Sequence, residues 1–150
     1  MINLKIGDKA PAINSVDQNN EKITLEQYKG TKIVLYFYPK DMTPGCTAQS
    51  CNLRDNYKAL LENGYVVLGC STDSPSRHVK FIEKHDLPFS LISDEDKKVV
   101  EDYGVWGLKK FMGKEYMGIN RTTFIIDENG VIKDIIEKVK TKEHANQIFK

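Results

Sequence analysis

The chain has 150 residues, which fits a single domain (1–150) and leaves little room for a second. Apolar residues make up 40% and charged residues 29%, so a packed core is possible and the composition excludes a disordered chain. The net charge of +1 excludes a typical nucleic-acid binder, and no apolar run reaches the roughly 20 residues of a membrane span.

The first predicted elements are strands. Residues 13–16 and 22–25 alternate weakly in hydropathy, which predicts an N-terminal β-hairpin. The run 33–38 is continuously apolar, β-branched and aromatic, and it predicts a central strand buried on both faces. After Thr43-Pro44-Gly45, apolar residues recur at helical spacing, which predicts one helix that Asn63-Gly64 ends.

The second half continues the alternation of strands and helices. A strand at 65–70 makes 33–70 a strand–helix–strand unit with parallel strands. Glycines interrupt 104–121, so this stretch is predicted to be a long loop of the kind that often carries function. The whole pattern predicts an α/β fold with a central mixed β-sheet and helices on both faces. The further elements expected are a helix capped by Ser74 that ends near His85, a strand at 89–92, a helix capped by Asp94 and closed by Gly104, an antiparallel hairpin of 122–126 and 131–136, and a short helix after Thr141.

The N-terminus and the cysteines favour the cytosol. Met1 to Lys5 contains no basic region followed by an apolar stretch, so no secretion signal is indicated. Cys46, Cys51 and Cys70 are an odd number in a chain large enough to fold without disulfides. We therefore expect a soluble cytoplasmic protein whose cysteines serve thiol chemistry, metal ligation or core filling.

Cys46 is the most informative of the three cysteines. It lies in the first turn of a helix that directly follows a buried strand, where unpaired backbone N–H groups and the helix dipole favour a thiolate. Because lower basicity also reduces nucleophilicity, an efficient enzyme needs further donors aimed at the substrate. The hydroxyl of Thr43 and the guanidinium of Arg121 are the candidates.

This arrangement resembles the active site of the peroxiredoxins. That family's pattern is a proline, three residues, a threonine, two residues and a cysteine, and Pro39, Thr43 and Cys46 match it. The sequence is similar to the bacterioferritin-comigratory-protein subfamily, also called Q-type, from about Leu4 to about Thr141. The matching strings lie at 7–11, 36–47, 73–74, 103–107 and 109–113, and Arg121 falls where the family has its active-site arginine.

The resemblance implies a thioredoxin-like fold and a thiol peroxidase for antioxidant defence. It implies reduction of hydrogen peroxide or organic hydroperoxides by Cys46, the peroxidatic cysteine, with no cofactor and no metal. Cys51 would be the resolving cysteine, in an intramolecular disulfide recycled by thioredoxin or a similar dithiol, and the protein is expected to be a monomer. The catalytic residues expected are Cys46, Cys51, Thr43 and Arg121, and the substrate-binding residues expected are Pro39, Thr43, Gly45 and Arg121.

The spacing of Cys46 and Cys51 constrains this mechanism. Five residues of helix give about 7.5 Å of rise and about 140° of turn, so the two α-carbons would lie roughly 8.5 Å apart. A disulfide needs about 4.4–6.8 Å between α-carbons. If Cys51 resolves Cys46, the first turns of the helix must therefore unwind in each cycle.

Other interpretations of the cysteines remain open at this point. Cys51 could be a core cysteine on a helix face, and Cys70 is expected to be a small buried hydrophobe. A general disulfide reductase would be expected to carry Cys-x-x-Cys, which the chain lacks. The alternative of another class is a non-catalytic redox-sensing or metal-binding module, although Cys46, Cys51 and a histidine offer no recognised zinc spacing.

The histidines and two aromatic residues receive structural interpretations. His78, His85 and His144 are expected at the surface or at an interface. Trp106 and Phe111 are expected to pack the long loop rather than bind a ligand.

Overall fold

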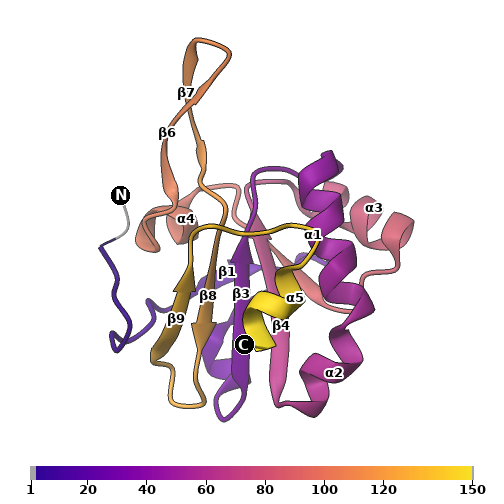
Figure 1. Ribbon diagram of the computed structural model, residues 1–150, viewed down its shortest axis with the longest axis vertical. Coiled ribbons are helices and arrows are strands. Elements are labelled where there is room, and N and C mark those ends of the chain that lie inside the picture. Colours follow the sequence, from indigo (N-terminus) through magenta and orange to yellow (C-terminus); the bar gives the residue numbers. More distant parts are fainter. Residues whose placement is uncertain (1–2, 150) are drawn as a thin grey trace.

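The computed structural model describes residues 3–149 and centres on a seven-stranded mixed sheet (Figure 1). The strand order is β2-β1-β5-β4-β3-β8-β9, and β6 and β7 form a separate two-stranded sheet. The strands are β1 Asn14–Val16, β2 Lys22–Thr24, β3 Lys32–Phe37, β4 Tyr65–Ser71, β5 Ser90–Ser93, β6 Trp106–Phe111, β7 Lys114–Ile119, β8 Thr122–Ile126 and β9 Ile132–Ile136. The helices are the 3-10 helix η1 Leu25–Tyr28, and α1 Pro44–Asp55, α2 Tyr57–Glu62, α3 Pro75–His85, α4 Lys98–Asp102 and α5 His144–Phe149. No helix within residues 3–149 is long and apolar enough to cross a membrane.

Strand β3 lies at the centre and is buried on both faces, as its apolar run predicts. It pairs in parallel with β4 and antiparallel with β8. Ile33, Leu35 and Phe37 belong to one core cluster together with residues of α4, whereas Val34 and Tyr36 belong to the other, together with residues of α1, α2, α3 and α5. The predicted mixed sheet with helices on both faces is confirmed.

Most of the remaining predicted elements are also confirmed. β1 and β2 form the N-terminal hairpin, and β8 and β9 form the C-terminal one. Ser74 caps α3 by accepting a hydrogen bond from the backbone N–H of Arg77 at 3.3 Å. The carboxylate of Asp94 accepts the backbone N–H groups of Val99 and Val100 at 3.1 and 2.8 Å, at the start of α4.

The predicted single helix after Pro44 is divided into α1 and α2. The break falls at Asn56, whose backbone leaves the helical region with φ −107° and ψ 9°. Its side-chain amide donates to the carbonyl of Asn52 at 2.8 Å, so the side chain competes with the backbone ladder. The two helices therefore run in succession along the same face of the sheet.

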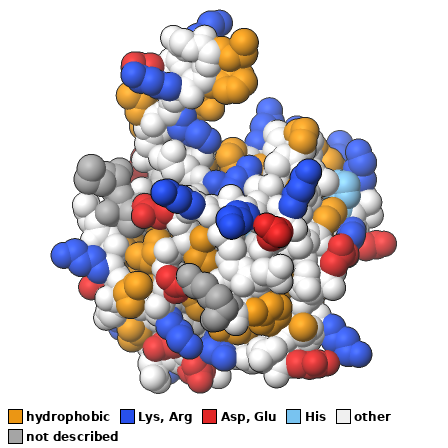
Figure 2. Space-filling model, in the orientation of Figure 1, with side chains coloured by type: hydrophobic (Ala, Val, Ile, Leu, Met, Phe, Trp, Pro, Cys, Tyr) orange, Lys and Arg blue, Asp and Glu red, His pale blue; other side chains and the backbone are white. Residues whose placement is uncertain are grey.

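The predicted loop at 104–121 is wrong, because this stretch forms the β6–β7 hairpin that stands out from the molecule (Figure 1). Its two-residue turn places Met112 at φ 51° and Gly113 at φ 80°, the left-handed pair that suits tight hairpins. Trp106 packs against the core as expected. Phe111 is 66% exposed, so the expectation that it packs is wrong, and hydrophobic side chains are visible over the hairpin in Figure 2.

Two of the three histidines are not at the surface. His78 and His144 are both fully buried, which corrects the prediction, and His85 is half-buried. His144 bonds to the hydroxyl of Thr123 at 2.8 Å and to the side-chain oxygen of Gln147 at 2.8 Å. The imidazoles are buried because each ring nitrogen finds a polar partner inside the fold.

Candidate active site

Cys46 lies where β3 leaves the sheet and α1 begins. Thr43 is the N-cap of α1 with extended backbone, and Pro44 occupies the first helical position, where its fixed φ and missing N–H cost nothing. Cys46 follows in the first turn, and its side chain is fully buried. The sequence prediction of a cysteine in the first turn of a helix is confirmed.

Two backbone donors are left free beside Cys46. The N–H of Thr47 bonds to the carbonyl of Thr43 at 2.9 Å, which closes the first turn of the helix. The N–H groups of Gly45 and Cys46 have no backbone partner among residues 3–149. Unpaired donors at a helix start stabilise an anion or a developing oxyanion.

Arg121 approaches Cys46 from the neighbouring strand. The pairing of Phe37 with Thr122 sets the residue before β8 beside the residues that follow β3. The Arg121 Nη2 donates to Cys46 Sγ at 3.3 Å. A Cβ atom on Gly45 would lie only 3.2 Å from that nitrogen, so the glycine leaves room for the guanidinium.

Gln49 is a site residue that the sequence analysis missed. Its side-chain oxygen accepts from Arg121 Nη1 at 2.6 Å, so the guanidinium bridges Gln49 and Cys46. Gln49 is fully buried, and its Nε2 has no hydrogen-bond partner among the described atoms. The available signal was its position three residues after Cys46, which places both on one helix face.

Thr43 and Pro39 lie on the loop that leads into α1. The Thr43 hydroxyl donates to the carbonyl of Lys40 at 2.8 Å and makes no capping bond to the helix. With its proton engaged, the Thr43 oxygen can accept a hydrogen bond from a hydroxyl or hydroperoxide. Pro39 and Thr43 are half-buried, so the loop is open to small molecules.

The three thiols are free and their surroundings differ. Cys51 is half-buried on the unbroken helix α1, five residues after Cys46. Cys70 is fully buried in β4, and burial, with a smaller contribution from Asp94, raises the pKa of its thiol well above the ordinary value. The prediction that Cys70 is a small buried hydrophobe is confirmed, and a thiol in this state is a poor nucleophile.

Lys109 adds a second cation near the site. It lies midway along β6, and its Nζ reaches back to the base of the hairpin, where it donates to the carbonyl of Ile119 at 2.9 Å. Burial lowers the pKa of Lys109, and the charge of Arg121 lowers it further, while Cys46 acts in the opposite direction. The hairpin therefore contributes positive charge within electrostatic reach of the thiol.

A second polar cluster lies behind the loop, where Asp41, Asp73 and His78 bring three metal-capable atoms within 4.8 Å of one another. Every one of their ligand atoms already has a protein partner. Asp41 is bonded to Tyr38 and His78, Asp73 to Arg77 and Ser71, and the second nitrogen of His78 to the carbonyl of Ile92. The cluster is thus a closed hydrogen-bond network.

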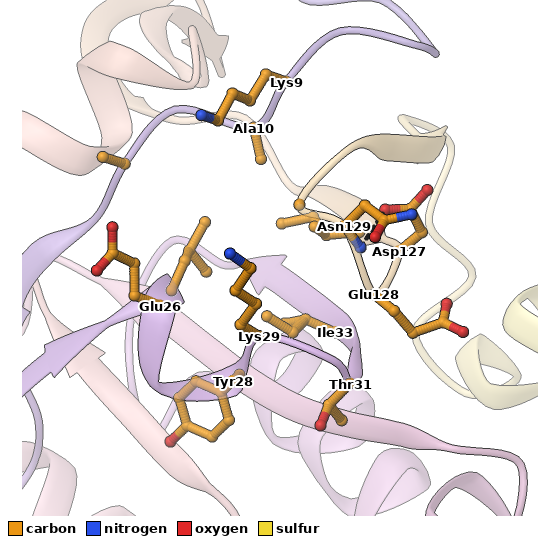
Figure 3. Close-up of a pocket in the computed structure, with 14 residues that line it drawn as sticks. Lys9, Ala10, Glu26, Tyr28, Lys29, Thr31, Ile33, Asp127, Glu128 and Asn129 are labelled. Atoms are coloured by element: carbon orange, nitrogen blue, oxygen red, sulfur yellow. Dashed lines mark hydrogen bonds between the residues drawn. The ribbon is translucent and has the colours of Figure 1, made fainter.

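A cavity of about 210 Å³ lies at the far end of the sheet (Figure 3). Ile33 at the start of β3 and Ile126 at the end of β8 line it, so it is separated from Cys46 by the length of β3, about 16 Å. Lys9 and Lys29 extend toward it, and Glu26 lies beside them (Figure 3). It has no thiol in its lining, and the chemistry described above lies elsewhere.

Comparison with known proteins places these features in one family. The model of the AhpC/TSA family matches residues 6–135. The chain is 50% identical over 146 residues to Peroxiredoxin Bcp of Escherichia coli (strain K12), which covers 97% of this chain and 94% of that protein. It is 49% identical over 142 residues to Peroxiredoxin Bcp of Bacillus subtilis (strain 168), covering 95% and 90% of the two chains.

Solved structures agree with this placement. Peroxiredoxin Q of Xanthomonas campestris superposes with a TM-score of 0.85 and 30% identity, covering 98% of this chain and 93% of that one. Peroxidoxin BcpB of Mycobacterium tuberculosis superposes with a TM-score of 0.85 and 33% identity, covering 96% and 93%. The match extends over almost the whole length of each chain.

Proposed function

This chain belongs to the AhpC/TSA family of peroxiredoxins, and we propose that Cys46 is the residue with which it reduces hydroperoxides. As a peroxiredoxin it is a thiol peroxidase. The observation that carries the assignment of Cys46 is the contact of 3.3 Å from Arg121 Nη2 to its sulfur, in the first turn of α1. Within residues 3–149 Cys70 has no such donor, and burial raises the pKa of its thiol well above the ordinary value.

In the first step the Cys46 thiolate attacks the terminal oxygen of hydrogen peroxide or an organic hydroperoxide. The S–O bond forms as the O–O bond breaks, which gives a cysteine sulfenic acid, and the departing oxygen takes up a proton as water or alcohol. Arg121 and the free N–H groups of Gly45 and Cys46 stabilise the charge that develops on the oxygens. The Thr43 oxygen accepts a hydrogen bond from the O–H of the hydroperoxide, and Pro39 shapes the entrance.

In the second step the Cys51 thiol condenses with the sulfenic acid, and water leaves. The disulfide that results lies within one chain, because both cysteines are on α1. Their helical separation of roughly 8.5 Å exceeds the reach of a disulfide, so the start of α1 unwinds to form it. This makes the protein an atypical two-cysteine peroxidase.

In the third step an external dithiol reduces the disulfide and restores both thiols. Thioredoxin is the expected reductant, since its exposed dithiol exchanges readily with a disulfide brought to the surface by unwinding. We propose further that residues 1–150 form one domain that acts as a cytoplasmic monomer in antioxidant defence. The continuous seven-stranded sheet supports the single domain, and a site formed within one chain supports the monomer.

The test is hydroperoxide consumption by the purified protein with a thioredoxin system, comparing the parent with three cysteine variants. Cys46→Ser is expected to abolish consumption. Cys51→Ser is expected to reduce one equivalent of peroxide and then stop, because the nucleophile remains but resolution does not. Cys70→Ala is the matched control and keeps turnover within about a factor of two, since its thiol is buried away from the reaction. Turnover by Cys46→Ser above the background of free thiols would overturn the proposal.

A further inference from the structure

A buried chain of hydrogen bonds lies behind the loop that carries Thr43. The Tyr38 hydroxyl donates to Asp41 Oδ1 at 2.5 Å, and His78 Nδ1 lies 2.6 Å from Asp41 Oδ2. The other ring nitrogen of His78 lies 3.0 Å from the carbonyl oxygen of Ile92 in β5. Tyr38 and His78 are fully buried and Asp41 is 1% exposed.

The partners in this chain of hydrogen bonds determine where the protons of His78 lie. The carbonyl of Ile92 can only accept, so His78 Nε2 carries a proton. The contact between His78 Nδ1 and Asp41 Oδ2 then holds one further proton between them. A hydrogen bond of this kind, away from water, is strong when complete and costly when one partner is lost.

Asp41 is also held by its backbone, through a second buried carboxylate. The backbone N–H of Asp41 donates to Asp73 Oδ2 at 2.8 Å, and that oxygen also accepts from the Ser71 hydroxyl at 2.6 Å. Asp73 Oδ1 accepts from Arg77 Nε at 3.1 Å. Asp41 is therefore held by its side chain through His78 and by its backbone through Asp73, from α3 and from the loop after β4.

Asp41 is the only fully buried residue in the loop 39–43, all of which the structure describes. Its neighbour Met42 is exposed and adopts φ 68°, a left-handed conformation that non-glycine residues hold only where the surroundings impose it. Thr43 comes next, and its hydroxyl bonds to the carbonyl of Lys40 across this turn. The hydrogen bonds of Asp41 with His78 and Asp73 therefore determine the shape of this turn. They also determine the position of the Thr43 oxygen.

We infer that His78 is a positioning residue for peroxide reduction, which acts through Asp41 on the Thr43 hydroxyl. It does not touch the reacting atoms. The inference rests on the proposed role of Thr43 as the group that orients the hydroperoxide. A misplacement of the reacting groups by about 1 Å can cost as much as a hundredfold in rate, so loss of the His78 contact predicts a large kinetic effect from a buried residue on another helix.

The experiment is a double-mutant cycle between His78 and Thr43. The second-order rate of Cys46 oxidation by hydrogen peroxide is measured for the parent, His78→Leu, Thr43→Val and the double variant, at a pH where the reactive thiol of each is ionised. His78→Gln is a conservative rescue, because its amide can still donate to Asp41. His85→Leu, the same substitution on the same helix, is the control.

We expect His78→Leu to be slower than the parent by about tenfold or more, and His78→Gln to recover part of that loss. The double variant should be no slower than Thr43→Val alone, because both substitutions remove the same function, the correctly placed Thr43 hydroxyl. His85→Leu should stay within a factor of two. If His78→Leu does not fold, Tyr38→Phe takes its place in the cycle, because it removes only the hydroxyl bond to Asp41, and a few-fold loss is then expected.

Three outcomes contradict the inference. One is a rate for His78→Leu, or for Tyr38→Phe in its place, within a factor of two of the parent. Another is a double variant whose loss is the product of the two single losses. The third is that His78→Leu reacts slowly while Thr43→Val reacts at the rate of the parent. This last result would also remove Thr43 from the proposed site.

Discussion

The guanidinium of Arg121 serves two acceptors at once. One nitrogen donates to Cys46 Sγ and another to Gln49 Oε1, so the planar fork is held in place while it faces the sulfur. A lysine carries the same charge on a flexible stem and has no fork. The geometry at this residue can therefore be separated experimentally from its charge.

We predict that Arg121→Lys lowers the second-order rate of Cys46 oxidation by about a hundredfold, the usual loss for one transition-state donor. The measurement is rapid-mixing kinetics with hydrogen peroxide, at a pH where the reactive thiol of parent and variant is ionised. Arg54→Lys is the matched control. Arg54 is on α1 like Cys46, but eight residues further along, which is about 12 Å of helical rise. Its rate should stay within a factor of two. An Arg121→Lys rate near that of the control would mean that charge alone suffices.

Single residues differ in how far the sequence can predict them. Pro39, Thr43 and Cys46 lie within eight residues, so the local spacing and the family resemblance were enough to select them. Arg121 was found through the resemblance and its place before a strand. Gln49 and His78 were missed, because their contacts join different elements. The spacing from Cys46 places Gln49 on the same helix face, but it does not reveal the bond to Arg121.

At the scale of elements, helix α1 has two halves with different attachments. The first half is held by Gln49 to Arg121 and by the Ser50 hydroxyl to Tyr36 at 2.8 Å. The second half is held by Asn52, whose side chain bonds to the carbonyl of Lys142 at 2.9 Å and to the N–H of Ala145 at 2.8 Å. The unwinding that we propose, which brings Cys51 to Cys46, would break the first set and leave the second set in place.

This division predicts where the oxidised protein loses protection. Amide hydrogen exchange at residues 47–51 should rise roughly tenfold or more after oxidation by peroxide, because a disulfide there breaks the helical hydrogen bonds. Exchange in α2, Tyr57–Glu62, should change little and is the internal reference. Peroxide-treated Cys51→Ser should keep the slow exchange of the reduced form. Equal protection of residues 47–51 in both redox states of the parent would contradict the unwinding.

The elements themselves were predicted with two errors that have physical causes. The β6–β7 hairpin was missed because its turn uses Met112 before Gly113, where Asn or Asp is the usual signal. The break between α1 and α2 was missed because periodic apolar residues continue through it, while Asn56 ends the ladder with its own side chain. The first error comes from an unusual turn residue, and the second from a side chain that outweighs the helical periodicity.

At the scale of the whole molecule, three distant parts of the chain meet at one edge of the sheet. The loop after β3 carries Thr43, the residue before β8 is Arg121, and the loop after β4 with α3 supplies Asp73 and His78. β3 and β4 are parallel, so their carboxyl ends lie side by side, which is where α/β proteins place their sites. The sequence predicted the parallel strand–helix–strand unit that creates this edge, but not the order of all seven strands.

The most direct test of the account is to map the disulfide that peroxide produces. The reduced protein is treated with one equivalent of hydrogen peroxide, its remaining thiols are alkylated, and its peptides are identified by mass spectrometry. We predict that Cys46 is joined to Cys51 within one chain, with two thiols lost and Cys70 recovered as a thiol once the protein is unfolded. A bond from Cys46 to Cys70, or a Cys46 disulfide between two chains, would contradict the account.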